Sequence, residues 1–376
     1  MKPTRLIMTL LSLVVIASML MGCGGTATTQ APAGGGEAKP AEKIKVGLSF
    51  SDFATERWKN EEILMRKLLE EKGYEVLSQE ANHDVKLQND QIDNMVSQGI
   101  KALIAIAEDG DAIVTSVDKA ADAGVKVIAY DRLIKSPKIA AYVSFNNVEV
   151  GRQQADGVMK AINVEAWDVA ANGKLRLVKL GGSPTDNNAI LFRKGQDEIL
   201  AKYEDKFEIV ADQWVDNWDA ANALKLMENI LTAANNDIDA VVASNDGTAL
   251  GALQAMKAQG LAGKVPISGQ DATADGCNSI VKGELTVSIL KDIRNLSPLA
   301  VDLADKLLKG QPTELKTYTM AELTNDPSKT GEVACYFLPV DQVTKDNVYD
   351  LVVKSGFQSY DDVYRDIPEA DKPPKP

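Results

Sequence analysis

Short apolar runs alternate with segments of helical period along most of the chain. In the first part, runs rich in β-branched residues occupy residues 44–50, 74–79, 102–107, 125–131 and 140–147. Between these runs, apolar residues recur at the spacing of amphipathic helices, and these segments end at Gly73, Gly99 and Gly124, as helix C-termini prefer. Repeated strand–helix units predict a parallel sheet with helices on both faces.

The same pattern restarts after residue 147. Further strand-like runs, separated by helix-like segments, occupy residues 174–182, 207–214, 240–246, 265–272 and 285–291. The chain therefore predicts two α/β domains of similar build. Later, a helix-like segment at 295–310 and a strand-like run at 332–340 suggest further crossings between them, and the proline-rich residues 367–376 are expected to fray.

The N-terminus departs from this pattern. Lys2 and Arg5 precede an apolar run that is somewhat short for a spanning helix and ends in Leu-Met-Gly before Cys23. This ending resembles the lipobox of bacterial lipoproteins, which implies cleavage after residue 22 and lipid on Cys23; the alternative is a plain secretory signal with a chance cysteine. Residues 23–42 include no large apolar side chain and predict a flexible tether, so the folded part is expected outside the cytoplasmic membrane, at the cell surface or in the periplasm.

Composition adds a limit on partners. The 376 residues are 45% hydrophobic and 25% charged, as in ordinary globular proteins, and carry a formal net charge of −13. Removal of the leader with Lys2 and Arg5 would make this −15. Such a charge argues against nucleic acid or an anionic membrane surface as partner and suits a neutral or cationic ligand.

Few residues offer metal or nucleophilic chemistry. His83 is the single histidine of the sequence and is expected in a surface loop, so a multi-histidine metal site or a His-based triad is hard to build. Cys277 and Cys335 could pair or remain free thiols. Dinucleotide, phosphate-loop, zinc-protease and nucleophile-elbow motifs do not occur, and no metal, cofactor or catalytic residue is expected.

Planar and charged side chains instead follow the predicted strands of both domains. In an open parallel sheet, ligands bind at the carboxyl ends of strands. The candidate ligand-binding residues there are Arg57, Trp58, Asp131, Arg132, Asn187, Asn188, Trp218, Asn245, Asp271 and Lys291.

These residue types suit a polyol. Carboxylates accept hydrogen bonds from hydroxyls, cations donate to oxygens, an amide can do both, and an indole ring can lie against the C–H face of a sugar. Each residue also has a purely structural interpretation. Asn245 could simply cap a helix, and the tryptophans could belong to the core. The coincidence of such groups at matching strand ends of two domains favours a shared site.

Several longer segments resemble one known family. They include YDRLI, VSFNNVEVGRQQA, GGSPTDNNAILFRKGQ, DQWVDNW, IDAVVASNDGTALGALQAM and GLAGKVPISGQDA, in an order that covers most of residues 44–360. The chain resembles the periplasmic binding proteins of sugar ABC importers, in the ribose/galactose-binding branch, and most strongly its D-xylose-binding members.

The resemblance implies two Rossmann-like lobes joined by a three-strand hinge that close on one sugar. The lobes would comprise residues 43–146 with 291–331, and 147–290 with 332–366. The resemblance also implies that the ten candidate residues bind the sugar, with Asn187 and Lys291 the less securely matched. Trp214 is a further candidate for a ring that stacks on the sugar. An insertion at residues 163–176 is expected at the surface.

The implied function is a monomeric, lipid-anchored receptor that delivers D-xylose to an ABC permease. Glucose, or another pyranose or pentose, is the alternative ligand, and sensing for a two-component or chemotaxis system is the alternative role. A sugar-responsive regulator would need a DNA-binding headpiece where this chain has its leader. A glycosidase would need paired carboxylates, which Asp131 and Asp271 could superficially supply, but the surrounding cations suit hydroxyl recognition better.

Overall fold

The computed structural model describes residues 42–376, of which Lys43–Pro376 form one compact unit. The expected leader, the lipidated Cys23 and the tether up to residue 41 lie outside the described residues. Within the described part, no helix combines the length and the apolar character needed to cross a bilayer.

The first sheet has seven strands in the order β10-β11-β5-β4-β3-β1-β2, and all neighbours are parallel except β10 and β11. Its strands are β1 (Lys45–Phe50), β2 (Glu75–Glu80), β3 (Ala102–Ala105), β4 (Lys126–Tyr130), β5 (Ala141–Phe145), β10 (Lys316–Thr319) and β11 (Glu332–Leu338). The first five match the apolar runs of the sequence. The fold class expected from the alternating pattern is confirmed.

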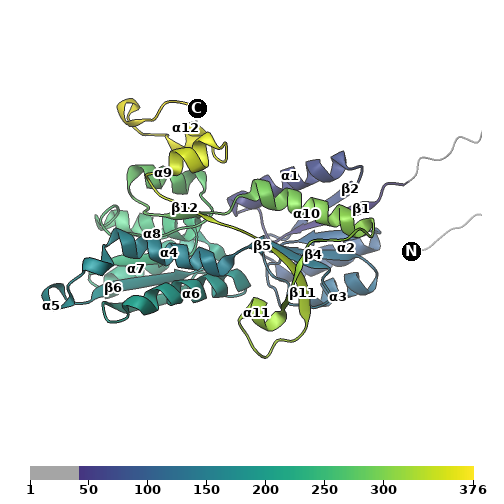
Figure 1. The fold of residues 1–376 in the computed structure, drawn as a ribbon, viewed down its shortest axis with the longest axis horizontal. Helices are drawn as coiled ribbons and strands as arrows, with labels where there is room; N and C mark the ends of the chain where they lie inside the picture. Colours follow the sequence, from purple (N-terminus) through teal and green to yellow (C-terminus); the bar gives the residue numbers. More distant parts are fainter. Residues whose placement is uncertain (1–41) are drawn as a thin grey trace, which may run out of the picture. The chain divides into compact units, whose positions relative to one another are not determined.

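Helices cover both faces of this sheet. They are α1 (Glu56–Glu71), α2 (Val85–Ser97), α3 (Val114–Asp122) and α10 (Ile293–Leu308). Alternate strand residues point to opposite faces, so Ile104 packs in the core under α1 and α10 whereas Leu103 packs in the core under α2 and α3 (Figure 1). Burial on both faces explains why the inner strands β1, β3, β4 and β5 read as nearly continuous apolar runs.

The second sheet is built in the same way. Its core order is β7-β6-β8, formed by β6 (Leu175–Gly181), β7 (Phe207–Trp214) and β8 (Ala240–Ala243). Parallel bridges continue it through Ile267 to Val287, next to the antiparallel pair β9 (Ser288–Leu290) and β12 (Asp341–Val343). The surrounding helices are α4 (Asn147–Ala161), α6 (Asn187–Leu200), α7 (Ala220–Ala233), α8 (Asp246–Ala258) and α9 (Ala274–Lys282).

The chain passes between the two sheets at three places. β5 leads into α4, which packs on α6 and β8; β9 leads into α10, which packs on α1 and the first sheet; and β11 leads into β12. Figure 1 shows the last crossing as a long strand segment running from β11 to β12. One expected boundary differs, because β11 belongs to the first sheet, where residues 332–335 pair with β10 and residues 335–338 with β5, and the crossing follows at residues 339–340.

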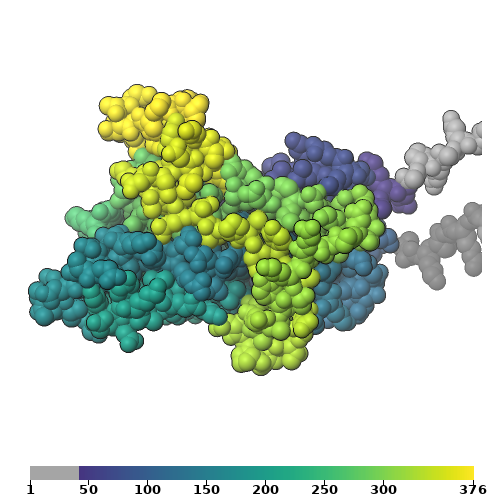
Figure 2. Space-filling view, viewed as in Figure 1, coloured from purple at the N-terminus to yellow at the C-terminus, as the bar shows by residue number. Residues whose placement is uncertain are grey.

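The C-terminal end also differs from expectation. Residues 367–376, which were expected to fray, are hydrogen-bonded to the segment before them. Tyr349 donates to the carbonyl of Pro374 at 2.8 Å, and Tyr360 donates to that of Pro373 at 2.6 Å. Figure 2 shows this C-terminal segment in yellow. It includes α12 (Tyr360–Val363), which packs on α9.

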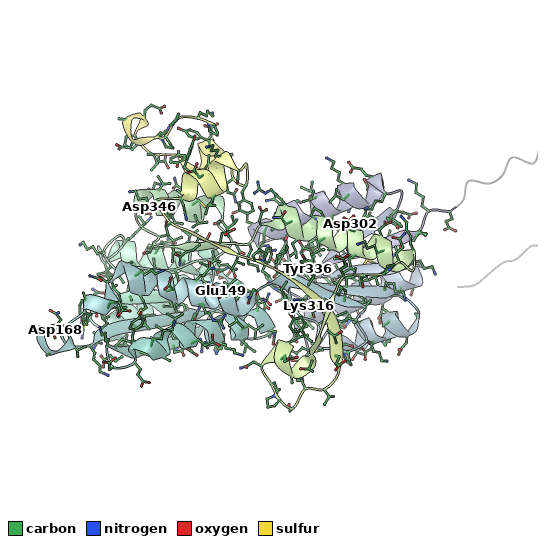
Figure 3. All side chains as sticks on the ribbon, in the orientation of Figure 1. Glu149, Asp168, Asp302, Lys316, Tyr336 and Asp346 are labelled. Atoms are coloured by element: carbon green, nitrogen blue, oxygen red, sulfur yellow. The ribbon has the colours of Figure 1, made fainter. Side chains whose placement is uncertain are left out.

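Most of the insertion at residues 163–176 lies at the surface as expected, but Val164 and Leu175 are buried, and β6 already begins at Leu175. The short helix α5 (Val169–Asn172) of this insertion has no buried residue, and Asp168, which caps that helix, projects at the outer end of the second sheet (Figure 3).

Candidate functional site

A cavity lies at the carboxyl ends of strands from both sheets. It has about 320 Å³ of space free of protein atoms, part of it open to solvent. Nine of the ten predicted residues line it, and the full lining is Thr55, Arg57, Trp58, Asp131, Arg132, Asp186, Asn188, Phe192, Trp218, Asn245, Gln270, Asp271 and Lys291. The fold thus brings together groups that are up to 236 positions apart in sequence, from Thr55 to Lys291.

Asn245 has both of the roles considered for it. Its side-chain oxygen accepts from the backbone N–H of Thr248 at 2.8 Å and so caps α8. The same side chain lines the cavity and is only 9% exposed. The cap uses one of the two lone pairs of this oxygen, so the expectation that a ligand meets donor and acceptor side by side stays a prediction.

Arg57 and Asp131 form the centre of an ion-pair network. Arg57 Nη1 lies 3.0 Å from Asp131 Oδ2 and 3.4 Å from Asp271 Oδ1, while Arg57 Nη2 lies 2.6 Å from Glu61 Oε1. Lys291 Nζ lies 2.8 Å from Asp131. Burial alone would raise the pKa of Asp131, but the nearby Arg57 and Lys291 lower this pKa to about 2. Asp131 is therefore a carboxylate at any physiological pH.

Several contacts in the site join residues of the two sheets directly. Arg132 follows β4, and its Nε lies 3.1 Å from Asp186 at the start of α6. Asn188 Nδ2 donates to both the backbone oxygen and Oδ1 of Asp131, each at 3.1 Å. Thr185 donates to the carbonyl of Glu108 at 3.3 Å. The structure thus has the two sides of the cavity in contact.

Asn187 is the predicted residue that does not reach the cavity. Its Nδ2 donates to the carbonyl of Leu323 at 2.7 Å, in α11 (Met320–Thr324). Consecutive residues of a helix point about 100° apart, so Asn188 can face the cavity only if Asn187 faces elsewhere. Asn187 instead ties α6 to the segment between β10 and β11.

Two tryptophan rings lie in the cavity wall. The Trp58 ring is stacked by Arg57, whose Cζ lies 4.4 Å from the ring centroid. The Trp218 ring meets Phe192 edge to face, with centroids 6.2 Å apart. Trp214, the less securely matched ring, is outside the lining and is stacked by Arg193 at 3.6 Å.

Four lining residues were not among the sequence candidates, namely Thr55, Asp186, Phe192 and Gln270. Asp186 and Gln270 stand next to predicted residues, in PTDNN and GQD. Phe192 follows Asn188 by one helical turn, which is a usable signal, because residues four apart share a helix face. The same spacing relates Arg57 to Glu61, the buried carboxylate that holds it.

His83 is not a plain surface histidine. Its Nδ1 lies 3.2 Å from Glu108 Oε2 and its Nε2 lies 3.7 Å from Asp52, and its side chain is 22% exposed. The hydrogen bond to Glu108 raises the pKa of His83. These three side chains are close enough to share a metal ion, but both ring nitrogens already face carboxylates and Arg132 lies 3.5 Å from Glu108. The arrangement fits an ion-pair cluster behind Arg132 better than a metal centre.

Comparison with known proteins agrees with this architecture. Residues 46–312 match the family model of the periplasmic binding protein domain. The D-xylose-binding periplasmic protein of Escherichia coli K12 is 42% identical over 322 residues, which cover 85% of this chain and 92% of that protein. The protein of the same description from Haemophilus influenzae is 40% identical over 326 residues, covering 86% and 93%.

A solved structure shows the same likeness in three dimensions. It is an ABC transporter solute binding protein from Clostridium phytofermentans with bound β-D-glucose, with a TM-score of 0.76 and 30% identity, covering 85% of this chain and 99% of that one. These relatives are binding proteins of transport systems rather than enzymes, in agreement with the expectation from the sequence. The chain belongs to the periplasmic binding protein family.

Proposed function

We propose that this chain is a sugar receptor that encloses one D-xylose molecule between its two lobes and delivers it to an ABC permease. The observation that carries the proposal is the convergence of nine predicted residues from both sheets on one cavity. The 42% identity to the D-xylose-binding protein of Escherichia coli favours xylose among the sugars.

The charges of the cavity favour an uncharged ligand. Arg57 and Lys291 lie within 3.0 Å of Asp131, and Arg132 lies 3.1 Å from Asp186. Because each cation is already paired with a carboxylate, the ligand does not have to supply a balancing charge, and a buried unpaired charge would be costly. A neutral polyol adds hydrogen bonds to this network without disturbing it.

Each group then has a role in holding a sugar. Carboxylate oxygens of Asp131 and Asp271 accept from hydroxyls, and the Asn245 amide nitrogen donates to an oxygen. The Trp58 and Trp218 rings cover apolar C–H faces of the sugar. A sugar that bridges the two lobes would bind their closed arrangement best. Its binding would therefore shift the population toward the closed form by a hinge motion.

Isothermal titration against D-xylose, D-glucose, L-arabinose and D-xylonate tests the proposal. We expect heat of binding with D-xylose at or below about 1 mM and weaker binding of D-glucose, whose additional CH₂OH group needs room. D-Xylonate, which carries a carboxylate, should bind weakest of the four. Absence of binding to every neutral sugar would contradict the receptor function, and tighter binding of D-glucose would contradict the assignment of xylose alone.

Membrane attachment and delivery rest on the sequence of residues 1–23. We propose lipid on Cys23, so that the receptor stays beside its permease. Cells that express the chain should incorporate labelled palmitate into it, and Cys23→Ser should abolish the label and release the protein from the membrane fraction. Uptake of labelled D-xylose by cells lacking the receptor should return with the wild-type gene. Unlabelled wild-type protein would refute the anchor, and unrestored uptake would refute delivery.

A further inference from the structure

Strand β6 ends at Gly181, and the next residue, Gly182, lies directly under the Trp218 ring. A Cβ atom placed on Gly182 would lie 1.9 Å from Trp218 Cη2, 2.1 Å from Cζ3 and 2.3 Å from Cζ2. Real Cβ contacts below 3.0 Å essentially do not occur. Any side chain at position 182 is therefore incompatible with the present position of this ring.

The backbone that carries Trp218 is itself unusual. Asn217 and Trp218 both have φ of +57°, in the left-handed region that residues other than glycine rarely adopt. Two such residues in succession cost conformational energy, so the surrounding contacts must stabilise this turn. The turn brings the indole ring across the end of β6 and into the cavity wall beside Phe192.

The preceding glycine makes an informative contrast. A Cβ on Gly181 would lie 2.6 Å from Trp214 Cε3 and 2.8 Å from Arg193 Nη2. The two neighbouring glycines thus accommodate two different tryptophans, Gly181 the ring of Trp214 and Gly182 the ring of Trp218. Trp214 lies outside the cavity lining, whereas Trp218 is part of it. Alanine at position 181 should therefore disturb only packing, and alanine at position 182 should also disturb the cavity wall.

We infer that Gly182 is a positioning residue for sugar recognition, acting through Trp218, an inference that rests on the proposed function. A hydrogen atom at position 182 lets the end of the indole ring lie on the backbone. A methyl group there pushes the ring out of the cavity wall and changes the apolar surface offered to the sugar. Gly182 itself has no side chain to touch the ligand, so its effect on affinity depends wholly on the ring.

A double-mutant cycle tests this dependence. Sugar affinity is measured by titration for Gly182→Ala, Gly181→Ala, Trp218→Ala and the double variant Gly182→Ala/Trp218→Ala. We expect Gly182→Ala to weaken binding by about tenfold or more and Gly181→Ala to change it by less than about threefold. The double variant should bind like Trp218→Ala alone, because the ring through which Gly182 acts is already gone. It also removes the clash and should fold even if Gly182→Ala does not.

A second readout does not need the sugar. The Trp218 emission is the difference between the fluorescence of a protein with Trp218 and that of its Trp218→Ala counterpart. With Gly182→Ala this difference spectrum should shift to longer wavelength and become easier to quench with acrylamide. An unchanged Trp218 spectrum, unchanged sugar affinity in Gly182→Ala, equal losses in both glycine variants, or additive effects in the cycle would each overturn the inference. Failure of the wild type to bind any sugar would instead overturn the proposed function.

Discussion

At the scale of single residues, the carboxyl group of Asp246 is the most unusual titratable group beneath the cavity. It follows Asn245 and is fully buried, and it accepts hydrogen bonds from Ser288 at 2.7 Å and from the backbone of Thr273 at 2.8 Å. Burial, together with the nearby charge of Asp271, raises its pKa to about 7. Asp246 thus joins α8, α9 and β9 behind the ligand-binding groups.

This pKa predicts a pH dependence of stability. The pKa of Asp246 is above its ordinary value of 3.8, so the folded protein holds the proton more tightly than the unfolded chain. The stabilisation is fully present below pH 3.8 and is lost as the pH rises through about 7. The free energy of unfolding, measured by urea denaturation from pH 4.5 to 8, should fall less steeply in Asp246→Asn than in the wild type. Parallel curves for the two proteins would refute the assignment to this residue.

The ligand-facing groups predict effects on affinity. Asn245→Ala and Asp271→Ala should each weaken sugar binding by roughly 1–3 kcal/mol, since each removes a hydrogen-bonding partner in a buried site. Asn187→Ala is the matched control, because Asn187 bonds Leu323 instead of lining the cavity. It should lower the melting temperature and change affinity little in titration. Unchanged affinity in both cavity variants would remove the assignment of the site.

At the scale of elements, the close packing of α4 against α6 fixes the position of the α6 residues that line the cavity. A Cβ on Gly151 of α4 would lie 1.9 Å from the carbonyl oxygen of Phe192, and a Cβ on Gly195 of α6 would lie 1.9 Å from that of Val148. The two glycines lie on facing sides and let the helix backbones touch. Asn188 and Phe192 reach the cavity from the same helix, so a shift of α6 would displace both.

Gly195→Ala should therefore push these helices apart. We expect a loss of roughly 1–3 kcal/mol in the free energy of unfolding, as for overpacked cores, together with weaker sugar binding. Lys202→Ala, at an exposed position just beyond the helix, is the control and should stay within about 0.5 kcal/mol of the wild type. Urea denaturation measures both, and a Gly195→Ala protein as stable as the wild type would show that the helices can relax at no cost.

At the scale of the whole described unit, ion pairs connect the two sides of the cavity directly. The Arg132–Asp186 and Arg57–Asp271 pairs, at 3.1 and 3.4 Å, each join groups from the two sides. Both arginines also face a second carboxylate, Asp131 for Arg57 and Glu108 for Arg132, so removal of one partner weakens the link between the two sides without leaving the cation wholly unpaired. The balance between open and closed forms should therefore respond to these residues as well as to sugar.

Asp186→Asn tests that balance with little harm to the fold, because asparagine can also cap α6. We expect a larger radius of gyration in small-angle X-ray scattering of the sugar-free variant than of the sugar-free wild type. Saturating sugar should reduce this difference, since binding favours the closed form. Identical sugar-free scattering for the two proteins would mean that the pair does not govern closure.

The alternation of apolar runs with helical periods was enough to predict the parallel α/β build, because side-chain periodicity and helix ends are local properties of the chain. The strand-end rule likewise predicted nine residues of the cavity lining. It could not tell that Asn187 turns away, since that depends on how α6 is rotated by its packing on α4 and α11.

Local sequence therefore determined the elements, their order and the kinds of chemical group at the strand ends. The pairing of those groups was decided by the fold alone: Arg57 meets Asp271 across 214 positions and Asn188 meets Asp131 across 57. The same holds for the partly buried setting of His83 between carboxylates and for the strand β11, which joins the first sheet. The physical reason is that periodicity depends only on neighbouring residues, whereas burial, charge compensation and ring contacts arise only when distant segments pack together.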